Sequence, residues 1–239
     1  MDAEKVAVIA ELAGNLQHAR SLRQAAAESG DATISRLRLR SWQATRLART
    51  YADLLQSERF GAAAEFFLSD LYGPKDFSAR DADIVRLVPL MARTLPLSAL
   101  QTISRALELD ALSENLDAKV AAELCHLGVL TIDGANYAAA YRSAGERPLR
   151  ERQIALIEEI GRALERLTRK PLVRGALRAM RKPAQLAGMA TLQEFLERGF
   201  NAFQMMGNAD EFLQTVCGRE TQLLVDLFSG EPSPQLVGM

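Results

Sequence analysis

Glu123 and His126 are the residues whose types and spacing point most directly to metal chemistry. They form a Glu-x-x-His motif, the helical pair that di-iron helix bundles use. Such a site needs a second motif of this kind and two further Glu side chains. The other histidine, His18, has Asn15 rather than Glu three positions before it, so the second motif is missing. We therefore expect no metal and no cofactor, and we interpret His126 as a helix-end residue that suits the helix dipole.

The two cysteines and two histidines could also support a zinc site or nucleophilic catalysis. Zinc needs at least three ligands, and no close spacing of Cys125, Cys217, the histidines and carboxylates supplies them. The sequence contains no nucleophile-elbow or P-loop pattern. A Cys–His pair formed by folding stays open, although a single helical Cys is more often a small buried apolar residue. The sequence therefore leaves enzymatic activity undecided.

A run of basic residues between positions 162 and 182 could hold an anion. It contains eight basic residues and one acid, Glu165, so its net charge is 8 − 1 = +7. Six of the basic residues recur every four positions, so consecutive members are neighbours on a helix, although Pro171 divides the run between two helices. An anion here would be a phosphate, an acidic lipid or a nucleic acid. The anion-binding candidates are Arg166, Lys170, Arg174 and Arg178.

Internal neutralisation is the alternative interpretation of this basic run. Residues 193–231 hold seven acids and two bases, a net charge of −5, and residues 108–133 hold six acids and one base, also −5. Packing these segments against the basic run would cancel its field, and we favour this interpretation. No aromatic residue lies between the basic ones, which argues against stacking of single-stranded nucleic acid, so nucleic acid is not expected as a partner.

Residues 65–83 form the densest cluster of aromatic, turn and acidic residues. Apolar spacing predicts a helix over 59–72, Gly73-Pro74 ends it, and a capping residue at Ser78 predicts the start of another helix. The alternatives are a structural corner with ordinary helix caps, which we favour, and a rigid corner that presents polar groups to a ligand or partner. The residues of that second interpretation are Asp70, Tyr72, Asp76, Arg80 and Asp81.

Three stretches of the sequence resemble an uncharacterised bacterial family of helical proteins, a domain of unknown function. They are FFLSDLYGPKDFSARD, which fits the pattern FFLxDLYGPxDFxxRD, ALELDALSENLD, and LQEFLERGFNAFQMMG. The resemblance covers most of the chain. It implies an all-helical fold but no activity, so it transfers no catalytic residue.

Composition and charge are typical of a globular cytoplasmic protein. Lys and Arg number 29 against 30 Asp and Glu, so no global charge draws the chain to nucleic acid or to an anionic membrane. Two cysteines form no disulfide framework and suit a reducing compartment. The N-terminus carries acids where a signal peptide has bases, and no apolar run approaches the roughly 20 residues of a membrane span.

Apolar periodicity predicts an all-α fold, a compact bundle of about nine to eleven helices, some short and kinked at Pro. We expect breaks at Pro89 and Pro183, and a short helix after Pro96. Five arginines of the second helix spread around its surface, so we interpret them as solvated side chains with scattered ion pairs. The predicted helices cover residues 3–28, 32–57, 59–72, 78–94, 97–107, 107–127, 134–142, 149–169, 171–190, 191–206 and 209–229.

The chain is predicted to form one domain over residues 1–230, with a candidate subdomain boundary near 143–148 and a flexible tail over 231–239. Its leading function is a non-catalytic binding or interaction protein, with a homo-oligomer or another protein as candidate partner. The alternative is a protein or enzyme that binds an apolar or anionic small molecule in a pocket near the 65–83 corner. A cluster of aromatic residues and methionines between 195 and 212 could line such a pocket, although core packing is the commoner use.

Overall fold

The computed structural model describes residues 3–28, 30–71, 86, 88–188 and 190–239. The described residues are helical with connecting turns and contain no strand, so the predicted all-α bundle is confirmed. Residues 88–94 are also helical. The other elements are α1 (Ala3–Ala27), α2 (Gly30–Thr50), α3 (Ala52–Leu55), α4 (Gly61–Phe66), the π-helix η1 (Phe67–Leu71), α6 (Leu97–His126), α7 (Gly134–Ala144), α8 (Arg147–Thr168), α9 (Pro171–Leu186), α10 (Ala190–Met206), α11 (Asp210–Ser229) and the 3₁₀-helix η2 (Pro234–Leu236).

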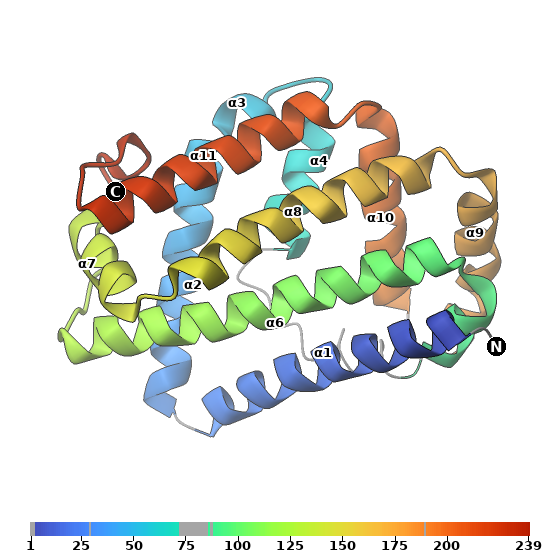
Figure 1. Ribbon diagram of the computed structural model, residues 1–239, viewed down its shortest axis with the longest axis horizontal. Coiled ribbons are helices and arrows are strands. Elements are labelled where there is room, and N and C mark those ends of the chain that lie inside the picture. The colour runs from blue at the N-terminus through green and yellow to red at the C-terminus, as the bar shows by residue number, and fades with distance from the viewer. Residues whose placement is uncertain (1–2, 29, 72–85, 87, 189) are drawn as a thin grey trace.

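The long helices form two layers. α1, α6, α8 and α11 lie side by side in that order along the long axis of the molecule, and each contacts the next (Figure 1). Behind them, α2, α4 and α10 run across that direction, with α2 against α6 and α10 against α4 and α8. α9 closes the end of the bundle near the N-terminus. None of the described helices is long and apolar enough to cross a membrane.

Three apolar clusters fill the space between the layers. The first joins α1, α6, α9 and α10 around Leu12 and Met180. The second joins α4, α8, α10 and α11 around Phe203 and Phe212. The third joins α2, α6, α7 and α11 around Tyr137. α6 contributes side chains to all three, which makes it the central helix of the bundle.

Two of the proline predictions are wrong. Pro96 opens α6 as its N-cap residue, but that helix continues for 30 residues because no Gly or Pro follows within it. Pro183 does not break α9, which extends to Leu186. Pro183 and Ala179, whose carbonyl loses its amide partner, are both exposed, so water can satisfy the freed carbonyl. Pro89 lies in the described helical stretch 88–94, whereas residues 72–85 and 87, with the predicted start of a helix at Ser78, lie outside the described part of the chain.

The predicted boundary near 143–148 is a short turn between α7 and α8. Gly145 and Glu146 both have positive φ, at 68° and 67°. Glu146 is the one described non-glycine residue with a positive φ, and its carboxylate pairs with the ammonium of Lys119 on α6. Both helices that flank the turn pack against the rest of the bundle, α7 against α6 and α11, and α8 against α6 and α11.

The C-terminal residues, expected as a flexible tail, fold back onto the bundle in this structure. Leu236 is buried in the third cluster. The Gln235 side-chain amide donates to the Arg219 carbonyl at 2.6 Å, and the Arg49 guanidinium donates to the Gly238 carbonyl at 2.7 Å. The tail therefore packs against α2 and α11 through both apolar and hydrogen-bonded contacts.

Candidate functional site

The 65–83 corner is described only in its first part. The predicted helix over 59–72 appears as α4 and η1, and Phe66 and Phe67 pack into the second cluster as expected for core residues. Asp70 belongs to η1. Tyr72, Asp76, Arg80 and Asp81 lie outside the described residues, so the ligand-presenting interpretation of this corner stays a prediction.

Ion pairs within the protein neutralise only part of the basic run. Arg162 pairs with Glu158 at 2.9 Å and with Asp210 at 2.6 Å. Arg169 pairs with Glu165, one turn earlier on the same helix. Arg181, the third paired residue, contacts Glu197 of α10 at 2.5 Å. These contacts raise the pKa of the Arg162 and Arg181 guanidiniums through hydrogen bonds to Asp210 and Glu197.

The other five basic residues of the run form no ion pair with any described residue. They are exposed, namely Arg166, Lys170, Arg174, Arg178 and Lys182. Two of them make neutral hydrogen bonds: the Lys170 ammonium donates to the Ser98 hydroxyl at 3.2 Å, and the Arg174 guanidinium donates to the Gln204 side-chain carbonyl. The favoured prediction, neutralisation by the acidic segments, therefore holds for Arg162 and Arg181, because α11 and α10 place carboxylates only near the two ends of the run. Arg169 is paired by the one acid of the run itself, and the other five residues are not neutralised by a described ion pair.

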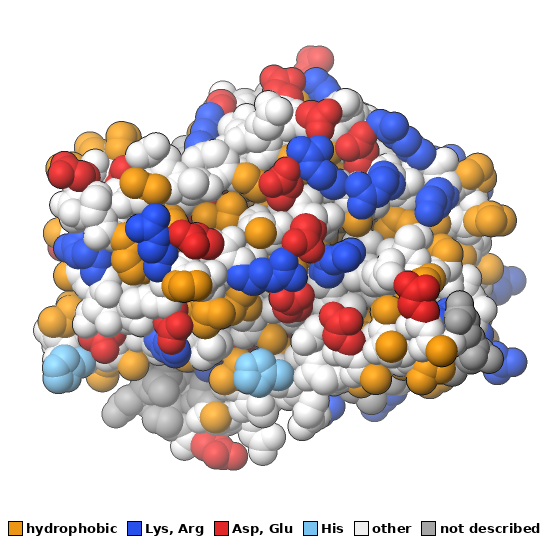
Figure 2. All heavy atoms as spheres, in the orientation of Figure 1, with side chains coloured by type: hydrophobic (Ala, Val, Ile, Leu, Met, Phe, Trp, Pro, Cys, Tyr) orange, Lys and Arg blue, Asp and Glu red, His pale blue; other side chains and the backbone are white. Residues whose placement is uncertain are grey.

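Three of the four anion-binding candidates line one groove of about 690 Å³ between the start of α9 and the end of α10. Arg166 is not among its lining residues. We call it the basic groove, and the described residues that line it are Thr168, Arg169, Lys170, Pro171, Arg174, Gly175, Arg178, Gln204, Gly207 and Asn208. None of these is acidic. Figure 2 shows Lys and Arg side chains gathered toward the α8–α9 end of the visible face.

A second, mostly apolar cavity of about 160 Å³ lies between α6, α8, α9 and α10. We call it the apolar cavity. Phe66 of α4 and Phe195 of α10 face each other at its wall, with ring centroids 5.3 Å apart. Gly199 lets them approach, since a Cβ there would lie 2.6 Å from the Phe66 ring. The other described lining residues are Met91, Leu95, Ala99, Thr102, Ile103, Ala106, Leu107, Leu109, Asp110, Ser113, Ile160, Leu164, Leu167, Val173, Leu177, Leu192, Leu196 and Phe200.

The few polar groups of the apolar cavity are already bonded within the protein. The Thr102 hydroxyl donates to the Ser98 carbonyl at 2.8 Å. The Ser113 hydroxyl donates to the Leu109 carbonyl and accepts from the Gln153 amide, both at 2.7 Å. Asp110 pairs with Arg23 of α1 at 2.6 Å. The cavity therefore offers a ligand apolar contact and little polar recognition.

The aromatic and methionine cluster near the C-terminus divides between core and cavity. Phe203, Met206 and Phe212 are buried in the second cluster, which agrees with the commoner use of such residues. Phe195 and Phe200 line the apolar cavity, while Met205 is exposed.

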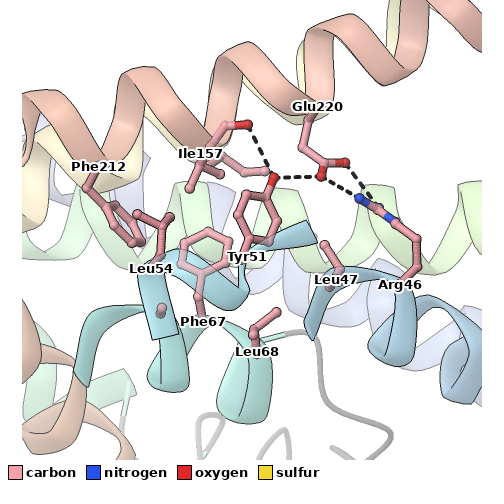
Figure 3. Close-up of a pocket in the computed structure, with 11 residues that line it drawn as sticks. Arg46, Leu47, Tyr51, Leu54, Phe67, Leu68, Ile157, Phe212 and Glu220 are labelled. Atoms are coloured by element: carbon pink, nitrogen blue, oxygen red, sulfur yellow. Dashed lines mark hydrogen bonds and ion pairs between the residues drawn. The ribbon is translucent and has the colours of Figure 1, made fainter. Parts of the chain in front are cut away.

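A third, much smaller pocket of about 40 Å³ has a polar end where α2 meets α11 (Figure 3). Glu220 accepts from the Arg46 guanidinium at 2.6 and 3.1 Å through its two carboxylate oxygens, and from the Tyr51 hydroxyl at 2.7 Å. Leu54 and Phe67 close its apolar side. At this volume the pocket has room for little more than one or two waters.

Burial and neighbouring charges shift the pKa values of Tyr51 and Arg46 at this polar end. Burial raises the pKa of the Tyr51 phenol, and the neighbouring Glu220 carboxylate raises it further. Burial alone would lower the pKa of Arg46, but the charge and hydrogen bonds of Glu220 outweigh it, so the net direction is upward. The Tyr51 phenol thus stays neutral and the Arg46 guanidinium stays charged at neutral pH, which suits a structural contact rather than proton transfer.

The sequence interpretation of the α2 arginines as solvated is wrong for Arg36 and Arg46, which are both buried. Arg36 and Arg40 both pair with the buried carboxylate of Glu114 on α6, and Arg23 of α1 joins them at 3.2 Å. A signal for this exists in the sequence: Arg36 and Arg46 lie three before and seven after Leu39, on the helix face that Leu39 buries.

The cysteines and histidines do not form a reactive centre in the described part of the chain. Cys125, His126 and His18 are exposed. Burial raises the pKa of the Cys217 thiol to about 11, so little of it is thiolate at neutral pH. Across the described residues, no three His, Cys, Asp or Glu side chains gather closely enough to hold a metal ion.

Comparison with known proteins gives a family but no activity. No curated protein matches the chain, and no solved structure does. The model of one protein family matches residues 22–234, nearly the whole chain, and its description is "Domain of unknown function (DUF8198)". The helical fold and this match agree with the resemblance noted in the sequence. The chain therefore belongs to the DUF8198 family of domains of unknown function.

Proposed function

We propose that the protein is a non-catalytic binding protein that holds a small apolar ligand in the apolar cavity. The observation that carries this proposal is the cavity itself, which is lined mainly by Leu, Ile, Phe, Met and Val side chains and has its polar groups already bonded. Water gains few hydrogen bonds in such a space, whereas an apolar molecule recovers the dispersion contacts that the walls lack.

The size of the cavity limits the ligand. An engineered protein cavity of ~150 Å³ lined by Leu, Ile and Phe stays dry and binds benzene or xenon. The apolar cavity, at about 160 Å³, suits a single aromatic ring or a short branched alkyl chain. Ordinary core packing leaves few voids larger than a water molecule, so a space of this size supports a role in binding.

The non-catalytic part of the proposal rests on the buried ionisable groups. Glu114, which is the most deeply buried charged residue of the described chain, and Arg46 are both engaged in ion pairs. Neither lines the apolar cavity. Asp110, which does line it, is paired with Arg23. A general acid or base would need a free group of shifted pKa facing the ligand.

Thermal unfolding in benzene-saturated buffer tests the proposal. Benzene at ten times its Kd would stabilise the folded state by about 1.4 kcal/mol, which raises Tm by about 3–6 °C for a chain of this size. Ala106→Leu fills the cavity and should abolish the rise. Ala122→Leu makes the same change at an exposed position of the same helix and should preserve it. The proposal is contradicted if benzene does not raise the Tm of the unmodified protein, or if both variants lose the rise in Tm equally.

Native mass spectrometry of the purified protein tests independently whether a ligand is bound. A small mass lost on denaturation would identify a co-purified ligand directly. A bare multiple of the chain mass would instead favour a homo-oligomeric interaction protein, which is the other class of binding protein that the sequence allows.

A further inference from the structure

We propose that the basic groove binds a phosphate-bearing small molecule. This inference does not depend on a ligand in the apolar cavity, because the groove lies on the outer side of α9 and shares none of the cavity's lining residues. It rests on the charge of the groove, on the way its cations are held, and on its size.

The groove has a positive charge that the protein does not cancel. Arg174 and Arg178 lie four residues apart on α9, so their side chains are neighbours, and neither forms an ion pair with a described residue. Lys170, the N-cap residue of α9, adds a third cation without a carboxylate partner. Arg169 is the one lining cation that forms an ion pair with a described carboxylate, that of Glu165. The start of α9 also lies here, and the positive end of its dipole favours an anion.

Neutral groups hold two of these cations and leave most of their donors free. The Gln204 side-chain carbonyl accepts one N–H of Arg174, and a guanidinium has five. The Ser98 hydroxyl accepts one of the three N–H groups of Lys170. Because the partners are uncharged, the cations keep their charge while losing freedom, so less entropy remains to be lost when an anion binds.

The donor chemistry and the volume select the ligand class. Arginine presents a planar fork of N–H groups that matches two oxygens of a phosphate. The groove measures about 690 Å³, inside the range of ~300–1,000 Å³ of ligand sites. A lone phosphate would leave most of it empty, whereas a phosphorylated compound would fill it. The phosphate belongs either to a soluble metabolite or to a lipid headgroup. The exposed apolar side chain of Leu172 beside the groove is compatible with a lipid.

Two probes separate these sources: isothermal titration with inorganic pyrophosphate, and co-sedimentation with phosphatidylglycerol vesicles against phosphatidylcholine vesicles. The test variant is Arg174→Gln/Arg178→Gln. The matched control is Arg166→Gln/Lys182→Gln, which removes the same charge from the same run at exposed positions that do not line the groove. Each variant is first checked for an unchanged Tm, since all four side chains are exposed.

We expect the unmodified protein to bind at least one of the two probes. The Kd for that probe should be about tenfold higher in the test variant and within about twofold of the unmodified value in the control. Binding of pyrophosphate with this pattern identifies a soluble phosphate ligand, and binding of phosphatidylglycerol vesicles alone identifies a headgroup. An equal loss in the two variants would mean a diffuse positive field rather than a site, and would overturn the proposal. Absence of binding to both probes would overturn it as well.

Discussion

At the scale of single residues, Glu220 joins two helices through one carboxylate. It accepts two hydrogen bonds from Arg46 and one from Tyr51, while Arg46 and Tyr51 are both buried (Figure 3). Two charges in such a place stabilise each other, but either one alone would be a buried charge without a partner. The contact between α2 and α11 therefore depends on the charge of Glu220.

Glu220→Gln should lower the free energy of unfolding by about 3 kcal/mol, because the change leaves the Arg46 charge buried and unpaired. Urea unfolding followed by circular dichroism measures it. Glu151→Gln is the matched control, since the Arg147–Glu151 pair is about half exposed on both sides and should contribute within about 0.5 kcal/mol. If both variants lose the same small amount, the Arg46–Glu220 pair is not a stabilising contact.

At the scale of the elements, α7 begins with a complete capping box. The Asp133 carboxylate accepts from the Asn136 backbone amide at 2.8 Å, and the Asn136 side-chain carbonyl accepts from the Asp133 amide at 3.0 Å. The Asn136 side-chain amide also donates to the Thr131 carbonyl at 3.0 Å, which fixes the preceding irregular segment. The sequence predicted a helix over 134–142, and the structure confirms its start at Gly134, with Asp133 as the N-cap residue.

Asp133→Ala should destabilise the protein by about 1 kcal/mol, because it leaves an N-terminal amide of α7 without an acceptor. Asp133→Asn keeps a side-chain acceptor and should change stability by only a few tenths of a kcal/mol. Chemical denaturation of the two variants side by side measures the difference. Equal losses would show that the charge of Asp133, rather than its hydrogen bond, stabilises the helix start.

At the scale of the whole molecule, two tyrosines in different apolar clusters couple stability to alkaline pH. Burial is the first cause that raises the pKa of Tyr51 in the second cluster and of Tyr137 in the third, from an ordinary value of 10. The unfolded chain releases these protons near pH 10, while the folded protein retains them. Their contribution to stability is therefore fully present below about pH 10 and is lost as pH rises above it.

The expected loss is about 1.4 kcal/mol per pH unit for each tyrosine above about pH 10. The Cys217 thiol, whose pKa burial raises to about 11, adds a loss of the same sign from about pH 9. Urea unfolding at pH 9, 10 and 11 measures the slope. Tyr51→Phe/Tyr137→Phe should make the decline above pH 10 shallower, whatever its effect at neutral pH. An unchanged slope in this variant would show that both phenols ionise normally in the folded protein.

The helices themselves were predictable because apolar periodicity and capping residues are local features of the sequence of each helix. The apolar spacing of α1, α8, α10 and α11 predicted those helices to within about two residues at each end. Prolines were harder to interpret from the sequence. The effect of Pro183 depends on whether the carbonyl that it frees faces solvent or the core, and only the packing of α9 determines that.

The candidate sites were predictable in part. The spacing of Lys170, Arg174 and Arg178 on consecutive turns identified them as neighbours, and they do line one groove. Local spacing could not show that Arg166 would point elsewhere, nor that Gln204 of α10 would lie opposite Arg174. The apolar cavity is still less visible in the sequence, because its walls come from α4, α6, α8, α9 and α10 and from the segment that precedes α6.

The sequence by itself determined the fold class, most of the helix positions and the family, since these depend on residue periodicity, helix-end chemistry and local similarity. Only the tertiary structure decided which charges cancel. Ion pairs and cavities depend on distances between segments far apart in the chain, as between Arg46 and Glu220, and those distances follow from how whole helices pack. The same packing buried Arg36 against Glu114 and left Arg174 and Arg178 exposed without a carboxylate partner among the described residues.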